Sequence, residues 1–285
     1  MSEETGSKSN PIDATVVMID VVGFSKLIMQ DQLEVVTKLS QLVREILNLE
    51  EIKTPVSDKT KVLLLPRGDG WGICFFAPDQ LTKAMKYAVM LNQRSDAIKI
   101  RRNGKELPSG IRIGVNKGLL HIYSDQSKGT DVEVAGVAIN QAERVMSVGD
   151  AGHIFCKVDI ADYLLRDGDL GPLIPRKNDG YQNRFRIQLK EGEDMIVVQG
   201  IHGKYQGLEV GNENIPNKIT LLAQKVATFH RKLKFSAREM GRFLGISKEN
   251  DDYIGELYAH FLEYGLSETP LDADINVTRT PFSRL

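Results

Sequence analysis

The chain has 285 residues, the length of one large domain or of one domain with an appendage. Its formal net charge is -1 and its pI is about 6.5, so no overall basic field is available to hold nucleic acid or an anionic membrane. The two cysteines, Cys74 and Cys156, lie in apolar segments without a C-x-x-C partner, and we expect reduced core residues. No apolar run approaches the roughly 18 residues that span a bilayer. We therefore expect a cytoplasmic protein that binds neither nucleic acid nor membranes.

The chain begins with a polar arm and then a strand and a helix. Residues 1–11 are small and polar, which is typical of disorder. "ATVVMIDVV" (14–22) predicts a buried strand, and Gly23-Phe24-Ser25 predicts a turn that leads directly into a helix. "DQLEVVTKLSQLVREILNLE" (31–50) has apolar residues at helical spacing and predicts an amphipathic helix.

Two hairpins and a second helix are expected in the middle of the chain. In "VLLLPRGDGWGICFF" (62–76), Gly-Asp-Gly separates two apolar runs, because glycine supplies the positive φ of a tight turn. A helix is expected over 79–97. "GIRIGVNKGLLHIYS" (110–124) shows β-type alternation around Asn116-Lys117-Gly118, which we interpret as a second hairpin.

The remaining patterns complete an α+β plan. The mixture of helices and hairpins predicts a sandwich with helices packed on a largely antiparallel sheet. We assign residues 12–211 to this domain and 212–285 to a C-terminal helical region and tail, in which "SAREMGRFLGIS" is more typical of core packing than of DNA binding. Helices are expected at 136–149 and 158–165, and strands at 153–157, 184–189 and 194–201.

Asp20 and Asp69 are the first candidate site residues. A carboxylate at the end of a buried strand is costly unless it is paired or holds a cation. Asp69 at a hairpin tip would add a second hard oxygen ligand for Mg²⁺ or Mn²⁺ with a nucleotide's phosphates. The main-chain N–H groups of Phe24 and Ser25 would face those phosphates. The simpler alternatives are a helix-capping Asp20 and a solvated turn at Asp69.

Four motifs occur in an informative order: "MIDVVGFSKL", "LPRGDGWGICFF", "IRIGVNKGLL" and "VEVAGVAINQAERVMSVGDAGHIFC". Together they closely resemble the catalytic domain of class III nucleotidyl cyclases, over about residues 14–201. The resemblance implies that Asp20, with its neighbour Val21, and Asp69 bind two divalent metals, Mn²⁺ or Mg²⁺. It also implies that Asn140 and Arg144, one helical turn apart, stabilise the transition state.

The resemblance has consequences for assembly. Family members place the metal pair and the Asn/Arg pair on opposite subunits, so a chain with one copy of each is expected to form a homodimer with two composite sites. Lys190 in "IQLKEGEDM" is the nearest match to the family's triphosphate lysine, and a solvated turn lysine is its alternative.

The base-reading positions depart from the family pattern. Leu65 stands where adenylate cyclases carry a lysine, and Glu133 occupies the second position, so neither adenine nor guanine recognition is matched. Arg67 shares a strand face with Leu65 and would donate to a pyrimidine carbonyl, or else form a salt bridge with a nearby acid. The P-R-G-D-G hairpin resembles the pyrimidine nucleotide cyclases of bacterial Pycsar anti-phage systems.

The sequence therefore favours a metal-dependent cyclase that converts UTP, or CTP, to the cyclic nucleotide for anti-phage signalling. One alternative is an adenylate or guanylate cyclase with an unusual base pocket. Others are a non-catalytic nucleotide sensor and a DNA-binding regulator that uses the C-terminal helices.

Overall fold

The computed structural model describes residues 10–49, 62–76, 79–102, 104–107, 110–125, 130–177, 180–181, 184–188, 195–217 and 276–279. The chain divides into two compact units, one within residues 1–184 and 198–214 and the other within 185–197 and 215–281. The predicted C-terminal helical region and tail lie outside the described residues apart from 212–217 and 276–279.

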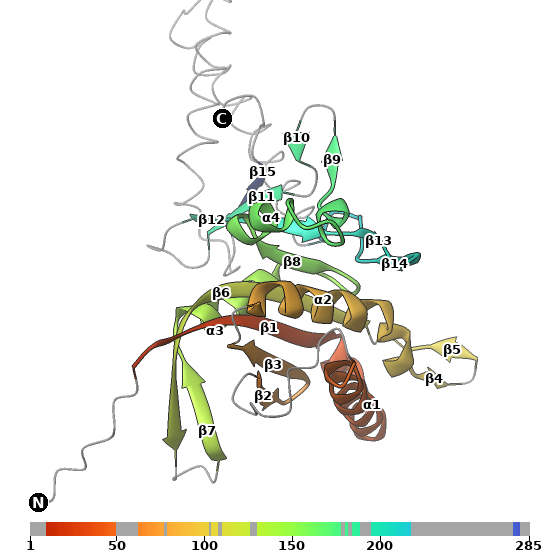
Figure 1. Cartoon of the computed structure of the whole chain (residues 1–285). Coiled ribbons are helices and arrows are strands. Elements are labelled where there is room, and N and C mark those ends of the chain that lie inside the picture. Colours follow the sequence, from red (N-terminus) through yellow and green to blue (C-terminus); the bar gives the residue numbers. More distant parts are fainter. Residues whose placement is uncertain are drawn as a thin grey trace, which may run out of the picture. The chain divides into compact units, whose positions relative to one another are not determined.

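A twisted sheet forms the centre of the first unit (Figure 1). Its strands run in the order β12-β8-β6-β1-β3-β2, and every pair is antiparallel except β6 and β8. β7 pairs with the far end of β6 to form an arm. The bounds are β1 Ile12–Val22, β2 Val62–Arg67, β3 Gly70–Phe75, β6 Gly110–Asp125, β7 Thr130–Ala135, β8 Ile154–Lys157 and β12 Met195–Ile201.

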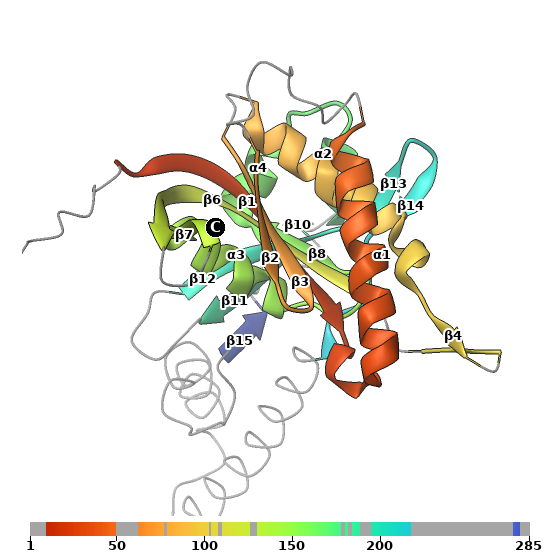
Figure 2. The ribbon, with the colours of Figure 1, turned by 90° about the horizontal axis from the view of Figure 1, so that it is seen from below.

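Helices cover both faces of this sheet (Figure 2). α1 (Met29–Leu47) and α2 (Gln80–Gln93) lie on one face, and α3 (Val137–Ser147) lies on the other. Strand alternation divides the core accordingly: Val17 and Ile19 of β1 pack toward α1 and α2, whereas Val16 and Met18 pack toward α3. The expected α+β sandwich is confirmed.

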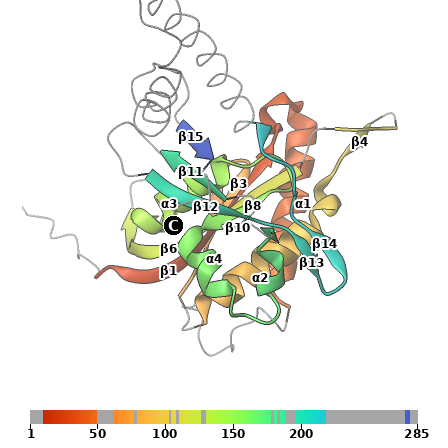
Figure 3. The same ribbon diagram turned by 90° about the horizontal axis from the view of Figure 1, so that it is seen from above.

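Smaller elements surround the sheet. β4 (Arg101–Arg102) and β5 (Lys105–Glu106) form a ribbon that projects beyond α1 (Figure 3), anchored by an ion pair between Arg102 and Asp31. The others in this unit are η1 Phe24–Lys26, η3 Ser95–Ile98, α4 Val158–Leu164, η5 Gly171–Leu173, β9 Arg176–Lys177, β10 Gly180–Tyr181, β13 Gly203–Tyr205 and β14 Leu208–Val210. No described helix is long and apolar enough to cross a membrane. Both cysteines are free and buried, as expected.

In the second unit, β11 (Arg184–Gln188) pairs through Phe185–Gln188 with β15 (Asn276–Arg279). Residues 212–285 were assigned to a C-terminal helical region and tail, and no strand was predicted there. "NVTR" contains two β-branched residues, which suits an added strand.

The second predicted hairpin is wrong. β6 is one continuous strand, and its pairing with β1 runs without a break from Gly110 to Leu120. Asn116 is fully buried, and its Nδ2 donates to the Ala138 carbonyl of α3. Gly118 also faces Ala138. Asn116 and Gly118 resemble turn residues in the sequence, but here they face α3, whereas Lys117 between them forms an ion pair with Asp13 of β1.

The contact between β6 and α3 depends on Gly114. A Cβ added there would overlap the backbone of Ala142 and Met146 in α3. Gly114 therefore sets how closely the helix that carries Asn140 and Arg144 approaches the sheet.

We predict that Gly114→Ala lowers the free energy of unfolding by about 1–3 kcal/mol, the usual cost of overpacking. Differential scanning calorimetry should show a lower Tm than wild type. Gly168→Ala is the control, because a Cβ there would meet nothing within 4 Å. Equal Tm values for the two variants would mean that α3 does not lie this close to β6.

Candidate active site

Asp20 lies near the end of β1, which is flanked by β3 and β6. It is paired with Gly70 of β3 on one side and with Arg112 of β6 on the other. By alternation its side chain points to the α3 face, and 18% of it is exposed. A Cβ at Gly70 would overlap the Ile19 carbonyl, so only glycine lets the hairpin lie this close to β1. That approach places Asp69, in the hairpin turn, beside Asp20.

Arg112 binds Asp20 directly. Its Nε and Nη2 each lie 2.7 Å from Oδ2 of Asp20, and its Nη1 donates to the Gly149 carbonyl at 3.3 Å. We did not predict this partner from the sequence. The one available signal was a charged residue between Ile111 and Ile113 on a strand, where alternation puts the charge on the face opposite the two isoleucines.

Three effects act on the pKa of Asp20. Burial raises this pKa most strongly, and the Arg112 guanidinium opposes that rise by its charge and its hydrogen bond. Asp69 raises the pKa further, through like charge and through a hydrogen bond between the two carboxyl groups. Two carboxylates held together in this way are suitable oxygen ligands for Mg²⁺ or Mn²⁺.

The turn after β1 differs from the prediction. Phe24–Lys26 form a separate 3-10 helix, and α1 begins only at Met29. Leu27 is extended and buried between them, and the Gln32 side chain donates to the carbonyls of Phe24 and Leu27. A three-residue helix lacks the dipole of a long one. The predicted phosphate contacts at Phe24 and Ser25 therefore rest on the family resemblance alone.

Leu65 and Arg67 lie on the α3 face of β2. Leu65 is buried in the cluster that includes Cys74, and burial raises the pKa of the Cys74 thiol to about 12. The Arg67 charge lowers that pKa. Arg67 itself is exposed, and within the described part of the chain it forms no ion pair, with Asp69 or any other acid.

Glu133 does not join Leu65 on one face. On β7 it is opposite Tyr123 of β6, and alternation puts it on the other side of the strand from Val134. Val134 packs in the same buried cluster as Leu65. The second base-reading prediction therefore remains a hypothesis without support from this arrangement.

Asn140 and Arg144 lie on the outward face of α3. The helix begins after Gly136, whose φ is 150° and where a Cβ would overlap the Leu119 carbonyl. Ala138 and Ala142 pack toward the sheet, whereas Asn140 is exposed and Arg144 is half-buried. Among the described residues, the charged groups that act on Asp20 are Arg112 and Asp69, not Arg144.

The predicted site residues therefore form two groups on different elements: the carboxylate pair of Asp20 and Asp69, and Asn140 and Arg144 on the side of α3 that faces away from the sheet. Val21, beside Asp20, is buried and packs toward α1 and α2. Lys190 lies outside the described residues.

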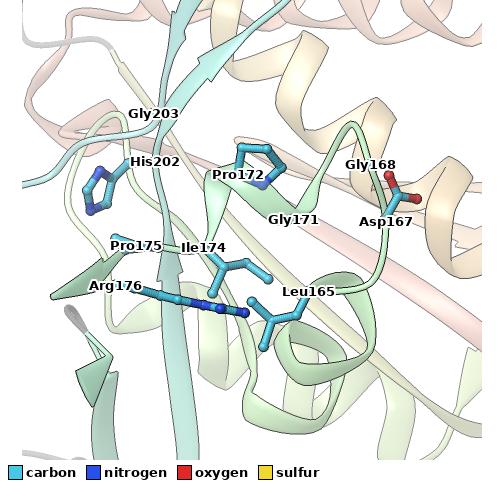
Figure 4. A pocket seen from close by; sticks show the side chains of 10 residues that line it. All are labelled: Leu165, Asp167, Gly168, Gly171, Pro172, Ile174, Pro175, Arg176, His202 and Gly203. Atoms are coloured by element: carbon cyan, nitrogen blue, oxygen red, sulfur yellow. The ribbon is translucent and has the colours of Figure 1, made fainter. Parts of the chain in front are cut away.

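A cavity of about 690 Å³ lies elsewhere in the first unit, between the segment after α4 and the start of β13 (Figure 4). Arg176 extends beside Leu165 and Ile174 along its wall. The Asp167 carboxylate at its rim accepts hydrogen bonds from the main-chain N–H groups of Asp169 and Leu170. None of the predicted site residues lines this cavity, so it is separate from the carboxylate pair.

The family model described as "Adenylate and Guanylate cyclase catalytic domain" matches residues 8–198, more than half of the chain. The chain therefore belongs to the adenylate and guanylate cyclase catalytic-domain family, class III. No curated protein matches it.

Solved structures show the same fold. The guanylyl cyclase Cya2 has 18% identity and a TM-score of 0.54, covering 72% of this chain and 100% of that one. The adenylyl cyclase CyaB from P. aeruginosa has 17% identity and a TM-score of 0.53, covering 70% and 98%. The catalytic core of a rhodopsin-guanylyl cyclase with converted specificity, in complex with ATPαS, has 16% identity and a TM-score of 0.51, covering 68% and 97%. At these identities the similarity shows the fold alone.

The raised pKa of Asp20 predicts how stability depends on pH. Because its pKa in the folded state lies above the ordinary value of 3.8, Asp20 stabilises the fold at low pH, and this contribution is lost as pH rises through the folded-state pKa. Without added metal, Asp20→Asn should raise the Tm at pH 7, and the gain should shrink toward zero at about pH 4.

Asp31→Asn is the matched control for this experiment. Asp31 is also buried and is also paired with an arginine, Arg102, which in turn binds Glu34. Its replacement should lower the Tm at pH 7, because it leaves Arg102 without its main partner. A lower Tm for Asp20→Asn at pH 7, or a gain that is independent of pH, would contradict the account of Asp20.

Proposed function

We propose that the protein is a metal-dependent pyrimidine nucleotide cyclase that acts as a homodimer and converts UTP, or CTP, to the 3′,5′-cyclic nucleotide and pyrophosphate. The observation that supports the proposal is the placement of the predicted residues in two groups on different elements of the chain. Asp20 and Asp69 form a carboxylate pair, whereas Asn140 and Arg144 point outward from α3, where a second chain can meet them.

The metal half-site consists of Asp20 and Asp69. Their carboxylates would hold the ions, with the main chain at Val21 next to them. Among the described residues no group of three or more His, Cys, Asp and Glu side chains occurs, so phosphate oxygens of the substrate and water would complete the ligand set. When bound, two Mg²⁺ or Mn²⁺ ions lower the pKa of the ribose 3′-hydroxyl and neutralise the triphosphate.

The second half-site consists of Asn140 and Arg144 from the other chain. The 3′-oxygen forms a bond to the α-phosphorus, the bond from that phosphorus to the pyrophosphate oxygen breaks, and the hydroxyl proton leaves to solvent. Arg144 donates to the oxygens on which charge develops, and Asn140 orients the ribose from the same helix face. Phe24 and Ser25 would contact the triphosphate through main-chain N–H groups, and Lys190 through its ammonium.

The base preference rests on Leu65 and Arg67. A buried leucine supplies no hydrogen bond at the position where a lysine would read adenine. Arg67 is exposed on the same strand face, forms no ion pair among the described residues, and offers a fork of donors to pyrimidine O2 or O4. Together with the P-R-G-D-G hairpin, this favours UTP and a role in anti-phage signalling.

A second candidate is an adenylate or guanylate cyclase with an atypical base pocket. The family description favours it, since it names both activities. A non-catalytic sensor is less favoured, because all four residues with proposed catalytic or metal-binding roles are present: Asp20, Asp69, Asn140 and Arg144.

Subunit complementation tests the composite site. Asp69→Ala and Arg144→Ala should each be inactive alone, since each removes one half of both sites in a homodimer. An equimolar mixture should recover about a quarter of wild-type activity, because half the dimers are mixed and each has one intact site. No recovery, with subunit exchange confirmed by labelled chains, would mean that each chain completes its own site.

Base selection is tested by comparing kcat/KM for the four nucleoside triphosphates. Wild type should prefer UTP, with CTP second, and Arg67→Ala should reduce the UTP-to-ATP ratio at least about tenfold, because a donor fork at the base is lost. Arg101→Ala, which changes an exposed arginine on β4, is the control. If ATP or GTP is the best wild-type substrate, the second candidate function is correct.

A further inference from the structure

The contact between Arg112 and Asp20 is concentrated on a single oxygen. Both Nε and Nη2 of the guanidinium lie 2.7 Å from Oδ2, and both side chains are largely covered, with 22% and 18% exposed. Charge-assisted contacts at this distance are among the strong hydrogen bonds of proteins.

In this ion pair, the positive charge of Arg112 compensates part of the negative charge of the Asp20 and Asp69 carboxylates. Asp69 acts on Asp20 with the same sign of charge, and Arg112 is the opposite charge that acts on Asp20 among the described residues. A divalent ion bound by the carboxylate pair would supply the same compensation at the same carboxyl group. Arg112 and the ion would therefore compete for the charge of Asp20, because two cations held by one carboxylate repel each other.

We infer that Arg112 is a displaceable counter-cation that competes with the metal for Asp20, a role that rests on the proposed metal-dependent function. Arg112 acts through Asp20 and is in this respect a positioning residue. Arg112 compensates the charge of the carboxylate pair when no ion is bound, and it lowers the affinity of the pair for metal in the absence of nucleotide.

The surroundings of Arg112 allow this exchange. Its backbone is fixed in β6 by pairing with β1, so only the side chain has to move. Its Nη1 already donates to the Gly149 carbonyl, just after α3. The guanidinium therefore keeps one hydrogen bond when it releases Asp20, which limits the cost of displacement.

Mn²⁺ binding without nucleotide, at pH 8, tests the inference. The loss of the free-Mn²⁺ electron paramagnetic resonance signal reports binding independently of activity. Arg112→Gln should bind Mn²⁺ about tenfold more tightly than wild type, equivalent to about 1.4 kcal/mol. Arg112→Lys keeps the charge but loses one of the two contacts, so its affinity should lie between those of wild type and Arg112→Gln.

Arg102→Gln is the matched control. It breaks another Arg–Asp pair, between Arg102 of β4 and Asp31 of α1, and should leave Mn²⁺ affinity unchanged. A merely structural role for Arg112 would weaken binding when it is replaced, so the direction of the change is decisive. Binding by Arg112→Gln that is equal to or weaker than wild type overturns the inference. If Arg112→Gln does not fold, equal or weaker binding by Arg112→Lys overturns it in the same way.

The proposed function fails differently. If wild type binds Mn²⁺ and Asp69→Asn abolishes that binding, the metal site stands and only the role of Arg112 is in question. If wild type binds no Mn²⁺, or if Asp69→Asn binds it equally well, the carboxylate pair is not the metal site and both proposals are overturned.

Discussion

The charge balance at Asp20 is the constraint on which the rest of the site depends. A carboxylate near the end of a buried strand needs an opposite charge, and here a second carboxylate, Asp69, increases that need. Arg112 meets the need only because β1 and β6 are in the register that pairs it with Asp20. Gly70 brings the hairpin close enough for Asp69 to take part. The sheet thus holds the like charges of Asp20 and Asp69 close together, although they repel each other.

The second constraint is the direction of α3. The small residues of α3 pack against β6, and Gly114 allows this close approach because it has no Cβ. Ala138 and Ala142 therefore face the sheet, and Asn140 and Arg144 lie on the opposite face of the helix. A helix cannot turn both faces to its own sheet. The proposed dimer follows from this geometry together with the chemistry that needs all four groups.

Local patterns were sufficient to predict most elements of the first unit. Apolar alternation identified β1, and Gly-Asp-Gly identified the hairpin that carries Asp69. The same reasoning was wrong at Asn116-Lys117-Gly118, because turn chemistry and the needs of a strand beneath a helix look alike in a sequence. The contact of Asn116 with α3 decides between them, and that contact is not local.

The contact between Arg112 and Asp20 was not predicted, for a related reason. A charged residue between two isoleucines indicates a strand, but its partner is set by a pairing 92 residues away in the chain. The residues predicted to read the base show the same limit. Arg67 lies on the α3 face as alternation required, whereas Glu133 depends on how the β6–β7 arm is built.

The most direct test of the account is to identify the product. The purified protein is incubated with Mn²⁺ and each of the four nucleoside triphosphates, and the products are identified by mass spectrometry, with Asp69→Asn treated in parallel. The account predicts a 3′,5′-cyclic mononucleotide and an equal amount of pyrophosphate, most rapidly from UTP, and neither from Asp69→Asn. No cyclic nucleotide from any of the four substrates, or an equal yield from Asp69→Asn, would contradict it.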